Sequence, residues 1–198
     1  MSNNEDDLIP EEVEGYHVGE KKTIDEYNKL DAEDESLAKW KASLGLSSTG
    51  SLLPVDPGDK RKVVVTELSI EFPEDSNLKP LTFNLDSTTN PTKEIKFDIK
   101  EKSVYQLVIK FKIQHEIITG LKYLHSVKRG GLRVDKVEEP LGSYAPNTTE
   151  NPIYIKKFSE VEAPSGMIAR GNYSAISKFI DDDKNVHLTL PWSFAIVK

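Results

Sequence analysis

Three consecutive carboxylates, Asp181, Asp182 and Asp183, are the first candidates for chemistry in this sequence, and they end the stretch of residues 165–183. Carboxylate oxygens suit Ca²⁺, but an oxygen cage needs ligands that are spaced along a loop, whereas adjacent loop residues point in different directions. A metal site is therefore disfavoured. Two interpretations stay open: a polar hairpin turn, or an acidic surface for a basic partner.

The sequence contains no arrangement that is typical of an enzyme. The four histidines, at 17, 115, 125 and 187, have no metal-ligand spacing, and there is no cysteine. A nucleophile elbow and a glycine-rich phosphate loop are also missing. We therefore expect a binding module without metal or cofactor, and an enzyme such as a lipid hydrolase is the weaker alternative.

The acidic charge is concentrated at the front of the chain. The 198 residues carry a net charge of −7, and residues 1–60 hold 15 Asp/Glu against 6 Lys/Arg. The rest of the chain is slightly basic, so the sequence argues against nucleic acid as a partner, which requires clustered Lys and Arg. The acidic segment fits a basic partner or a solvated tail. No apolar run approaches the roughly 20 residues of a membrane span, and the acidic N-terminus does not resemble a signal peptide, so we expect a cytoplasmic protein.

The elements that must position these residues are β-strands. From residue 61 onward apolar residues alternate with polar ones, most clearly in Tyr105–Ile113 and Leu188–Ile196, and Met167–Ile180 is expected to form another long strand. Arg129-Gly130-Gly131 has the composition of a hairpin turn. Eight or nine strands without an intervening helix predict an all-β fold, an immunoglobulin-like antiparallel β-sandwich over residues 61–198. Pro191 predicts that the last strand is bulged or at a sheet edge there.

Residues 1–60 are expected to form a flexible N-terminal arm. Residues 1–20 hold 7 Asp/Glu and no Lys or Arg, which predicts disorder, and residues 47–61 have the composition of a linker. Between them, residues 23–45 predict two short helices, the first opened by the capping box Thr23–Glu26. Helices this short are only marginally stable in isolation. They pack either on their own domain or, as we favour, on a partner with Trp40 as an anchor.

Several long motifs then resemble one family, the Rho GDP-dissociation inhibitors, especially the fungal members. They are LDAEDESLAKWK from Leu30, HEIITGLKYLH from His115, LGSYAP from Leu141, EAPSGMIARGNYS from Glu162 and FIDDDK from Phe179. The resemblance implies a carrier that holds prenylated Rho-family GTPases, preferably GDP-bound, extracts them from membranes and slows GDP release. It implies a monomer that forms a heterodimer with the GTPase and touches membranes only transiently. A general carrier of prenylated or acylated signalling proteins is the alternative.

The resemblance also assigns residues. A geranylgeranyl group would lie between the sheets, although the same residues are equally expected of an ordinary core; its walls would be Ile70, Phe97, Tyr105, Phe111, Ile117, Ile176, Leu190 and Trp192. The residues implied to contact the GTPase lie in the arm and the acidic run: Tyr16, Asp34, Ser36, Leu37, Trp40, Asp182 and Asp183. An acidic rim for the basic residues before the prenylated cysteine would consist of Asp135, Glu160 and Glu162.

Overall fold

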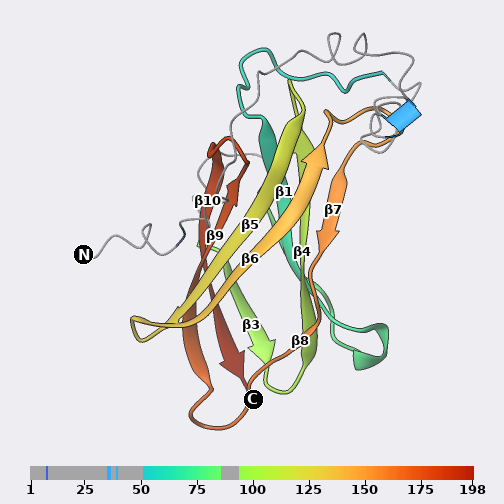
Figure 1. The fold of residues 1–198 in the computed structure, drawn as a ribbon. Helices are drawn as coiled ribbons and strands as arrows, with labels where there is room; N and C mark the ends of the chain where they lie inside the picture. The colour runs from blue at the N-terminus through green and yellow to red at the C-terminus, as the bar shows by residue number, and fades with distance from the viewer. Residues whose placement is uncertain (1–7, 9–34, 37–38, 40–50, 86–93) are drawn as a thin grey trace.

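The computed structural model describes residue 8, residues 35–36, residue 39, and residues 51–85 and 94–198. Within these residues the chain forms two β-sheets that face each other (Figure 1). The all-β sandwich expected from the alternating pattern is confirmed. No helix in the described part of the chain is long and apolar enough to cross a membrane.

The first sheet has the strand order β2-β1-β4-β7, and β8 pairs with the start of β4. All of its pairs are antiparallel. Its strands are β1 (Val63–Glu71), β2 (Leu81–Asn84), β4 (Val104–Ile113), β7 (Tyr154–Lys157) and β8 (Val161–Glu162). A single 3₁₀ turn, η2 (Glu74–Ser76), lies between β1 and β2.

The second sheet has the order β3-β10-β9-β5-β6. Its strands are β3 (Lys96–Lys100), β5 (Ile118–Arg129), β6 (Leu132–Tyr144), β9 (Gly171–Ile180) and β10 (Val186–Val197). The pair β3–β10 is parallel, so the expectation of a purely antiparallel sandwich is corrected at this edge. The two strands are far apart in sequence, and only strands joined by a hairpin are forced to be antiparallel.

Two local expectations are met. The β5–β6 hairpin turns at Gly130 and Gly131, whose φ values of 54° and 83° are those that a two-residue hairpin loop requires. Pro191 pairs with β9, whereas pairing with β3 begins only at Ser193. Among the described residues, β10 therefore has no paired neighbour on one side at the proline, which is where a residue without an N–H is tolerated.

A third expectation is wrong. The strand predicted to begin at Met167 begins at Gly171, and residues 167–169 form a turn. Gly166, with φ 95°, precedes this turn, and the Gly166 carbonyl accepts hydrogen bonds from the N–H groups of Ala169 and Arg170. These local bonds replace the ladder that a strand would make.

The sandwich has two ends, which we name by their residues. The linker end holds residues 51–61, the β4–β5 connection (residues 114–117) and the β9–β10 turn (residues 181–185); these lie together at the top of Figure 1. The mouth end holds the tip of the β5–β6 hairpin, the β3–β4 turn and the loop of residues 163–170. Alternate residues of each strand point between the sheets, so the interior runs continuously from one end to the other.

Candidate functional site: an apolar cavity at the mouth end

A cavity of about 520 Å³ lies between the two sheets toward the mouth end. Its volume is within the range of about 300–1,000 Å³ that is usual for small-molecule sites. The lining is predominantly apolar and aromatic. The residues that line it are Ile70, Ile99, Tyr105, Leu107, Tyr123, His125, Val127, Arg129, Val134, Asp135, Val137, Glu139, Phe158, Ser159, Val161, Pro164, Tyr173, Trp192 and Phe194.

Aromatic rings form one wall of this cavity. The Trp192 ring lies 5.7 Å from Phe194 and meets Phe97 edge-on at 5.9 Å, and Phe194 stacks on Tyr173 at 4.9 Å. These residues come from neighbouring strands at alternating positions, which places their rings on one face of the second sheet. Such ring contacts hold the wall in a fixed geometry and leave its apolar surface available to a ligand.

The inner surface of the cavity also carries a small polar cluster without a net charge. Trp192 Nε1 donates to Ser177 Oγ at 3.0 Å, and the Ser177 and Tyr123 hydroxyls lie 2.7 Å apart. His125 Nδ1 lies 3.4 Å from both hydroxyls. Burial lowers the pKa of His125 to about 4, against a smaller opposing effect of Asp135, so the imidazole is neutral near pH 7. Burial likewise raises the pKa of Tyr123.

The mouth of the cavity mixes apolar and charged groups. Asp135 and Glu139 line it from β6, and Arg129 lines it from the end of β5. Glu160 and Glu162 are exposed on the segment that forms the opposite side, next to the lining residue Val161. Of the three predicted rim residues, Asp135 therefore lines the cavity, while Glu160 and Glu162 flank a lining residue. The structure adds Glu139, whose carboxylate pairs with Lys156 at 2.6 Å.

Three of the eight predicted wall residues line the cavity: Ile70, Tyr105 and Trp192. Phe97 is buried behind Trp192, Leu190 is buried in the core, and Phe111 packs at the linker end between Tyr144 and Tyr154. Ile117 is half-buried in the β4–β5 connection.

Ile176 lies on the opposite face of the second sheet, where it packs with Leu8, Leu124 and Ile180. The cause is the two-residue period of a strand: Ala175 and Ser177 point inward, so the residue between them points outward. The alternating pattern could have revealed this, and it could also have found Tyr123, His125 and Val127, which share the inner face of β5 with one another.

The three consecutive carboxylates differ in their roles. Asp181 is buried, and its side chain accepts hydrogen bonds from the backbone N–H of Asn185 at 2.8 Å and from His187 Nε2 at 2.8 Å. Burial acts to raise the pKa of Asp181, but these hydrogen bonds outweigh it and keep the pKa below its ordinary value. Asp181 therefore closes the hairpin, which is the structural interpretation that the sequence left open.

Asp182 and Asp183 are half-buried at the surface of the same turn. The Asp182 N–H donates to the Thr119 carbonyl at 3.3 Å, and its carboxylate lies directly over Gly120. A Cβ at Gly120 would be 1.6 Å from Asp182 Oδ2, and the φ of Gly120 is 56°. The sequence HEIITG thus contains the glycine that lets the acidic turn lie against the start of β5. Among the described residues, no group of three or more His, Asp or Glu side chains is arranged to hold a metal ion.

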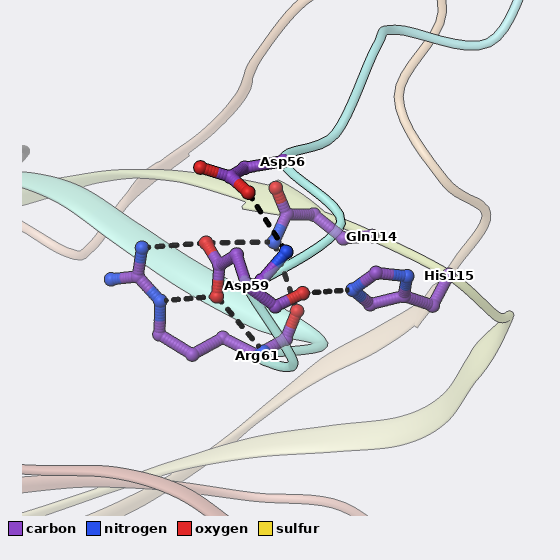
Figure 2. A network of polar contacts seen from close by, with 6 residues as sticks. Asp56, Asp59, Arg61, Gln114 and His115 are labelled. Atoms are coloured by element: carbon purple, nitrogen blue, oxygen red, sulfur yellow. Dashed lines mark hydrogen bonds and ion pairs between the residues drawn. The ribbon is translucent and has the colours of Figure 1, made fainter.

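The end of the predicted linker is bound to the sandwich (Figure 2). Asp59 accepts hydrogen bonds from Arg61 Nε and Nη2 at 2.8 and 2.6 Å, and these bonds hold the pKa of Asp59 well below its usual range. His115 Nε2 contacts the Asp59 carbonyl oxygen at 2.7 Å, and the Gln114 amide donates to the Arg61 carbonyl at 2.9 Å. Because both contacts come from the β4–β5 connection, the chain enters the sandwich beside the acidic turn.

Residues 51–53, at the beginning of the described linker, are also bound to the sandwich. The Leu53 N–H donates to the Asn147 carbonyl, and the Thr149 N–H donates to the Ser51 carbonyl. Ser36 is helical and exposed. The other arm residues to which the sequence assigned a role, Tyr16, Asp34, Leu37 and Trp40, lie outside the described residues, as do nearly all of the segments expected to be disordered or helical.

The class that the fold and the site define is an all-β sandwich with an apolar cavity between its two sheets. The family described as "RHO protein GDP dissociation inhibitor" matches residues 1–198. The Rho GDP-dissociation inhibitor of Saccharomyces cerevisiae is 56% identical over 186 residues, covering 92% of this chain and 90% of the relative. The Schizosaccharomyces pombe protein of the same name is 43% identical over 183 residues, covering 91% of this chain and 85% of the relative.

The human Rho GDP-dissociation inhibitor 1 is 37% identical over 195 residues, covering 98% of this chain and 90% of the relative. This chain belongs to the Rho GDP-dissociation inhibitor family, and its higher identity to the two fungal proteins supports a fungal-type member. Its relatives are named as inhibitors, that is, as regulators rather than enzymes.

Proposed function

We propose that this protein binds prenylated Rho-family GTPases, preferably in the GDP-bound form, shelters the geranylgeranyl tail in the cavity, and slows GDP release. The observation that carries this proposal is the 520 Å³ apolar cavity with a neutral polar cluster on its inner surface, in a chain of this family. The family names supply the GTPase, and the cavity supplies a place for a hydrocarbon.

The energetics require such a cavity. At about 0.8 kcal/mol per buried CH₂, a chain of about twenty carbons costs roughly 15 kcal/mol to move from a bilayer into water. Contacts on a flat surface do not offset this amount, whereas transfer into an apolar cavity replaces one apolar environment with another. The proposed walls are the lining residues, so Tyr123, Val127 and Phe194 join Ile70, Tyr105 and Trp192. The other five residues expected from the sequence do not line the cavity and are no longer included: Phe97, Phe111, Ile117, Ile176 and Leu190.

The arm and the acidic turn are proposed to bind the GTPase itself. Asp182 and Asp183 would pair with basic residues near switch II, while the arm would order over the switch regions and restrict nucleotide exit. Because the linker is attached next to this turn, the arm would start beside the surface it must reach. The arm residues proposed for this contact are Tyr16, Asp34, Ser36, Leu37 and Trp40.

The acidic rim is proposed to hold the basic segment that precedes the prenylated cysteine. Exposed ion pairs are each worth under about 1 kcal/mol, so the rim would serve orientation and encounter more than affinity. The protein would act in the cytoplasm as a monomer that forms a heterodimer with one GTPase. No nucleic acid, metal or cofactor enters this proposal.

Catalysis at the Ser177–His125 contact is the weaker alternative. The distance from Ser177 Oγ to His125 Nδ1 is 3.4 Å, longer than the usual nucleophile–base bond of about 2.6–3.2 Å. The Ser177 side chain is fully buried and already binds Trp192 and Tyr123. These contacts support a structural role for the cluster.

Filling the cavity tests the proposal. Val137 lines the cavity but is only half-buried, so Val137→Trp fills the space with little strain on the core. We expect at least a hundredfold loss of affinity for a prenylated GTPase and no change for the unprenylated form, measured by titration calorimetry. Ile155→Trp, at an exposed position of β7, is the matched control. Equal affinity of the variant and the wild type for the prenylated GTPase would refute the assignment of the cavity.

Removal of the arm separates the GTPase inhibitor from a general lipid carrier. Because residues 51–61 bind the sandwich, the truncation should start at Ser51. We expect the truncated protein to keep its affinity for a prenylated peptide but to lose inhibition of GDP release. Undiminished inhibition would favour a mechanism that does not use the arm.

A further inference from the structure

The loop before β9 presents two large apolar side chains to water. Met167 and Ile168 are 86% and 88% exposed, the two highest values among the large hydrophobic residues of the described chain. Isolated exposed hydrophobics are common on protein surfaces, but adjacent ones that form part of a patch usually mark a binding surface.

This loop is held in position by specific bonds. Glu101, in the β3–β4 turn, accepts hydrogen bonds from the Gly166 N–H at 2.9 Å and from Arg170 Nε and Nη2 at 3.0 and 2.6 Å. The Tyr173 hydroxyl donates to the Ala169 carbonyl at 2.6 Å. The bonds fix a turn whose apolar side chains contribute almost nothing to the core, so the benefit of this order lies in contact with something else.

The exposed pair belongs to a larger patch at the cavity mouth. Arg129 Nη2 donates to the Arg170 carbonyl at 2.7 Å, which joins the tip of the β5–β6 hairpin to the loop. Leu132 and Val134, on that hairpin, are 75% and 54% exposed. We call the patch the apolar rim; it consists of Leu132, Val134, Val161, Met167 and Ile168. Val134 and Val161 also line the cavity, so the apolar rim and the cavity form one apolar surface.

Basic residues accompany the apolar rim on its β5–β6 side, whereas the exposed Glu160 and Glu162 flank Val161 on the other side. Residues 128–136 hold Lys128, Arg129, Arg133 and Lys136 against the single carboxylate of Asp135. Exposed apolar side chains beside lysine and arginine are typical of surfaces that bind at the interface of anionic membranes.

We propose that the apolar rim inserts into the headgroup region of an anionic lipid bilayer, with Met167 and Ile168 at its tip. The inference extends the proposed function, because it gives the tail a route: the mouth opens on the bilayer, and the hydrocarbon passes into the cavity without crossing water. This continuity favours a membrane over a protein partner, since a protein seated on the apolar rim would separate the mouth from the lipid.

A single fluorescent label tests the contact directly. The chain has no cysteine, so Ile168→Cys carries one environment-sensitive label, and Ile155→Cys, exposed on β7, carries the matched control. With vesicles of phosphatidylcholine and phosphatidylserine, we expect a blue shift and a severalfold rise in emission at position 168, weaker without phosphatidylserine, and neither change at position 155. Unchanged emission at position 168, or equal changes at both, would overturn the proposal.

A pair of double variants tests whether the loop contributes to vesicle binding and to extraction of the GTPase. We expect Met167→Ser with Ile168→Ser to lower vesicle affinity and the rate of extraction of prenylated GTPase from vesicles by at least tenfold. Affinity for a prenylated peptide in vesicle-free solution should stay within twofold, and Ile155→Ser with Val186→Ser should change none of these quantities. Loss of affinity for prenylated GTPase in solution would instead make the loop a protein contact and refute the membrane assignment. If the wild type bound vesicles but no prenylated peptide, the proposed function would fail while the membrane contact stood.

Discussion

The inner face of β4 is packed at one end of the sandwich and open at the other. Toward the linker end, Ile109, Phe111 and Ile113 are fully buried, and Phe111 lies 5.1 Å from the Tyr144 ring and 5.7 Å from the Tyr154 ring. Toward the mouth end, Tyr105 and Leu107 of the same strand face the cavity. One alternating pattern therefore produces a core in one half of the strand and a cavity wall in the other.

The difference arises from the opposing elements rather than from β4. At the linker end, aromatic residues of β6 and β7 fill the space between the sheets. At the mouth end, β6 contributes Val134 and Val137, which are smaller, and β8 has only two residues. We therefore expect the packed interior at the linker end to contribute mainly stability and the open interior at the mouth end to bind the lipid, whereas the acidic turn at the surface of the linker end serves both the hairpin and the GTPase. Four changes test these roles.

The largest effect is expected from removing a ring at the packed end. Phe111→Ala should lower the free energy of unfolding by about 3–5 kcal/mol, because it leaves a closed void in the core. Leu107→Ala should cost only about 1–2 kcal/mol, since this half-buried side chain already faces an open cavity. Chemical denaturation measures both. Similar losses of stability for the two variants would remove the distinction between the ends.

Gly120→Ala should lower the free energy of unfolding by about 2–3 kcal/mol, because alanine disfavours the left-handed backbone and its Cβ would overlap the Asp182 carboxylate. Gly131→Ala is the matched control: its φ is also positive, 83°, but nothing lies within 4 Å of an added Cβ. We expect the control to cost less and only the Gly120 variant to lose affinity for the GTPase, because Asp182 must move. Equal costs for the two variants would show that the contact with Asp182 contributes nothing.

Asp181→Asn should lower the free energy of unfolding by about 1–2 kcal/mol at neutral pH, because the hydrogen bonds that the Asp181 carboxylate accepts inside the turn become weaker. The folded-state pKa of Asp181 lies below its ordinary value of 3.8, so the unfolded state binds more protons and the carboxylate's contribution is lost as pH falls below about that value. Stability measured as a function of pH should therefore decline less steeply in the variant over this range. Parallel curves would contradict the assignment.

The smallest effect on folding is expected from Asp183→Arg, at the half-buried surface of the same turn. We expect about a tenfold loss of affinity for the GTPase, or about 1.4 kcal/mol, with an unchanged melting temperature. Glu74→Arg, in the exposed η2 turn, controls for the change of charge. A lowered melting temperature would mean that Asp183, like Asp181, serves the hairpin.

The alternating pattern was sufficient to predict the sandwich and most of its strands, because period-two burial is a local property. It could not predict the parallel β3–β10 pair, because the alternation within a strand does not indicate which strand will be its neighbour in the sheet. It also overextended β9, since Met167 and Ile168 have the composition of a strand, whereas Glu101, more than sixty residues away in sequence, holds them in a turn.

The candidate site was predictable in kind but only partly in detail. Ile70, Phe97 and Phe111 are all inward-facing apolar residues, and nothing local distinguishes the one that lines the cavity from the two that pack in the core. That distinction depends on what faces each residue across the gap. The carboxylates of the acidic run differ for the same reason. His187 binds Asp181 inside the hairpin, whereas Gly120 leaves room for the Asp182 carboxylate at the surface, and the run itself indicates neither contact.

The most direct test of the central claim is an isotope-filtered NMR measurement on the full-length protein bound to a geranylgeranylated peptide. We expect intermolecular contacts from the isoprenoid methyl groups to Leu107, Val127 and Trp192 at the mouth end, and none to Phe111 at the linker end. Isoprenoid contacts confined to the outside of the sheets, with the cavity resonances unshifted, would contradict the account.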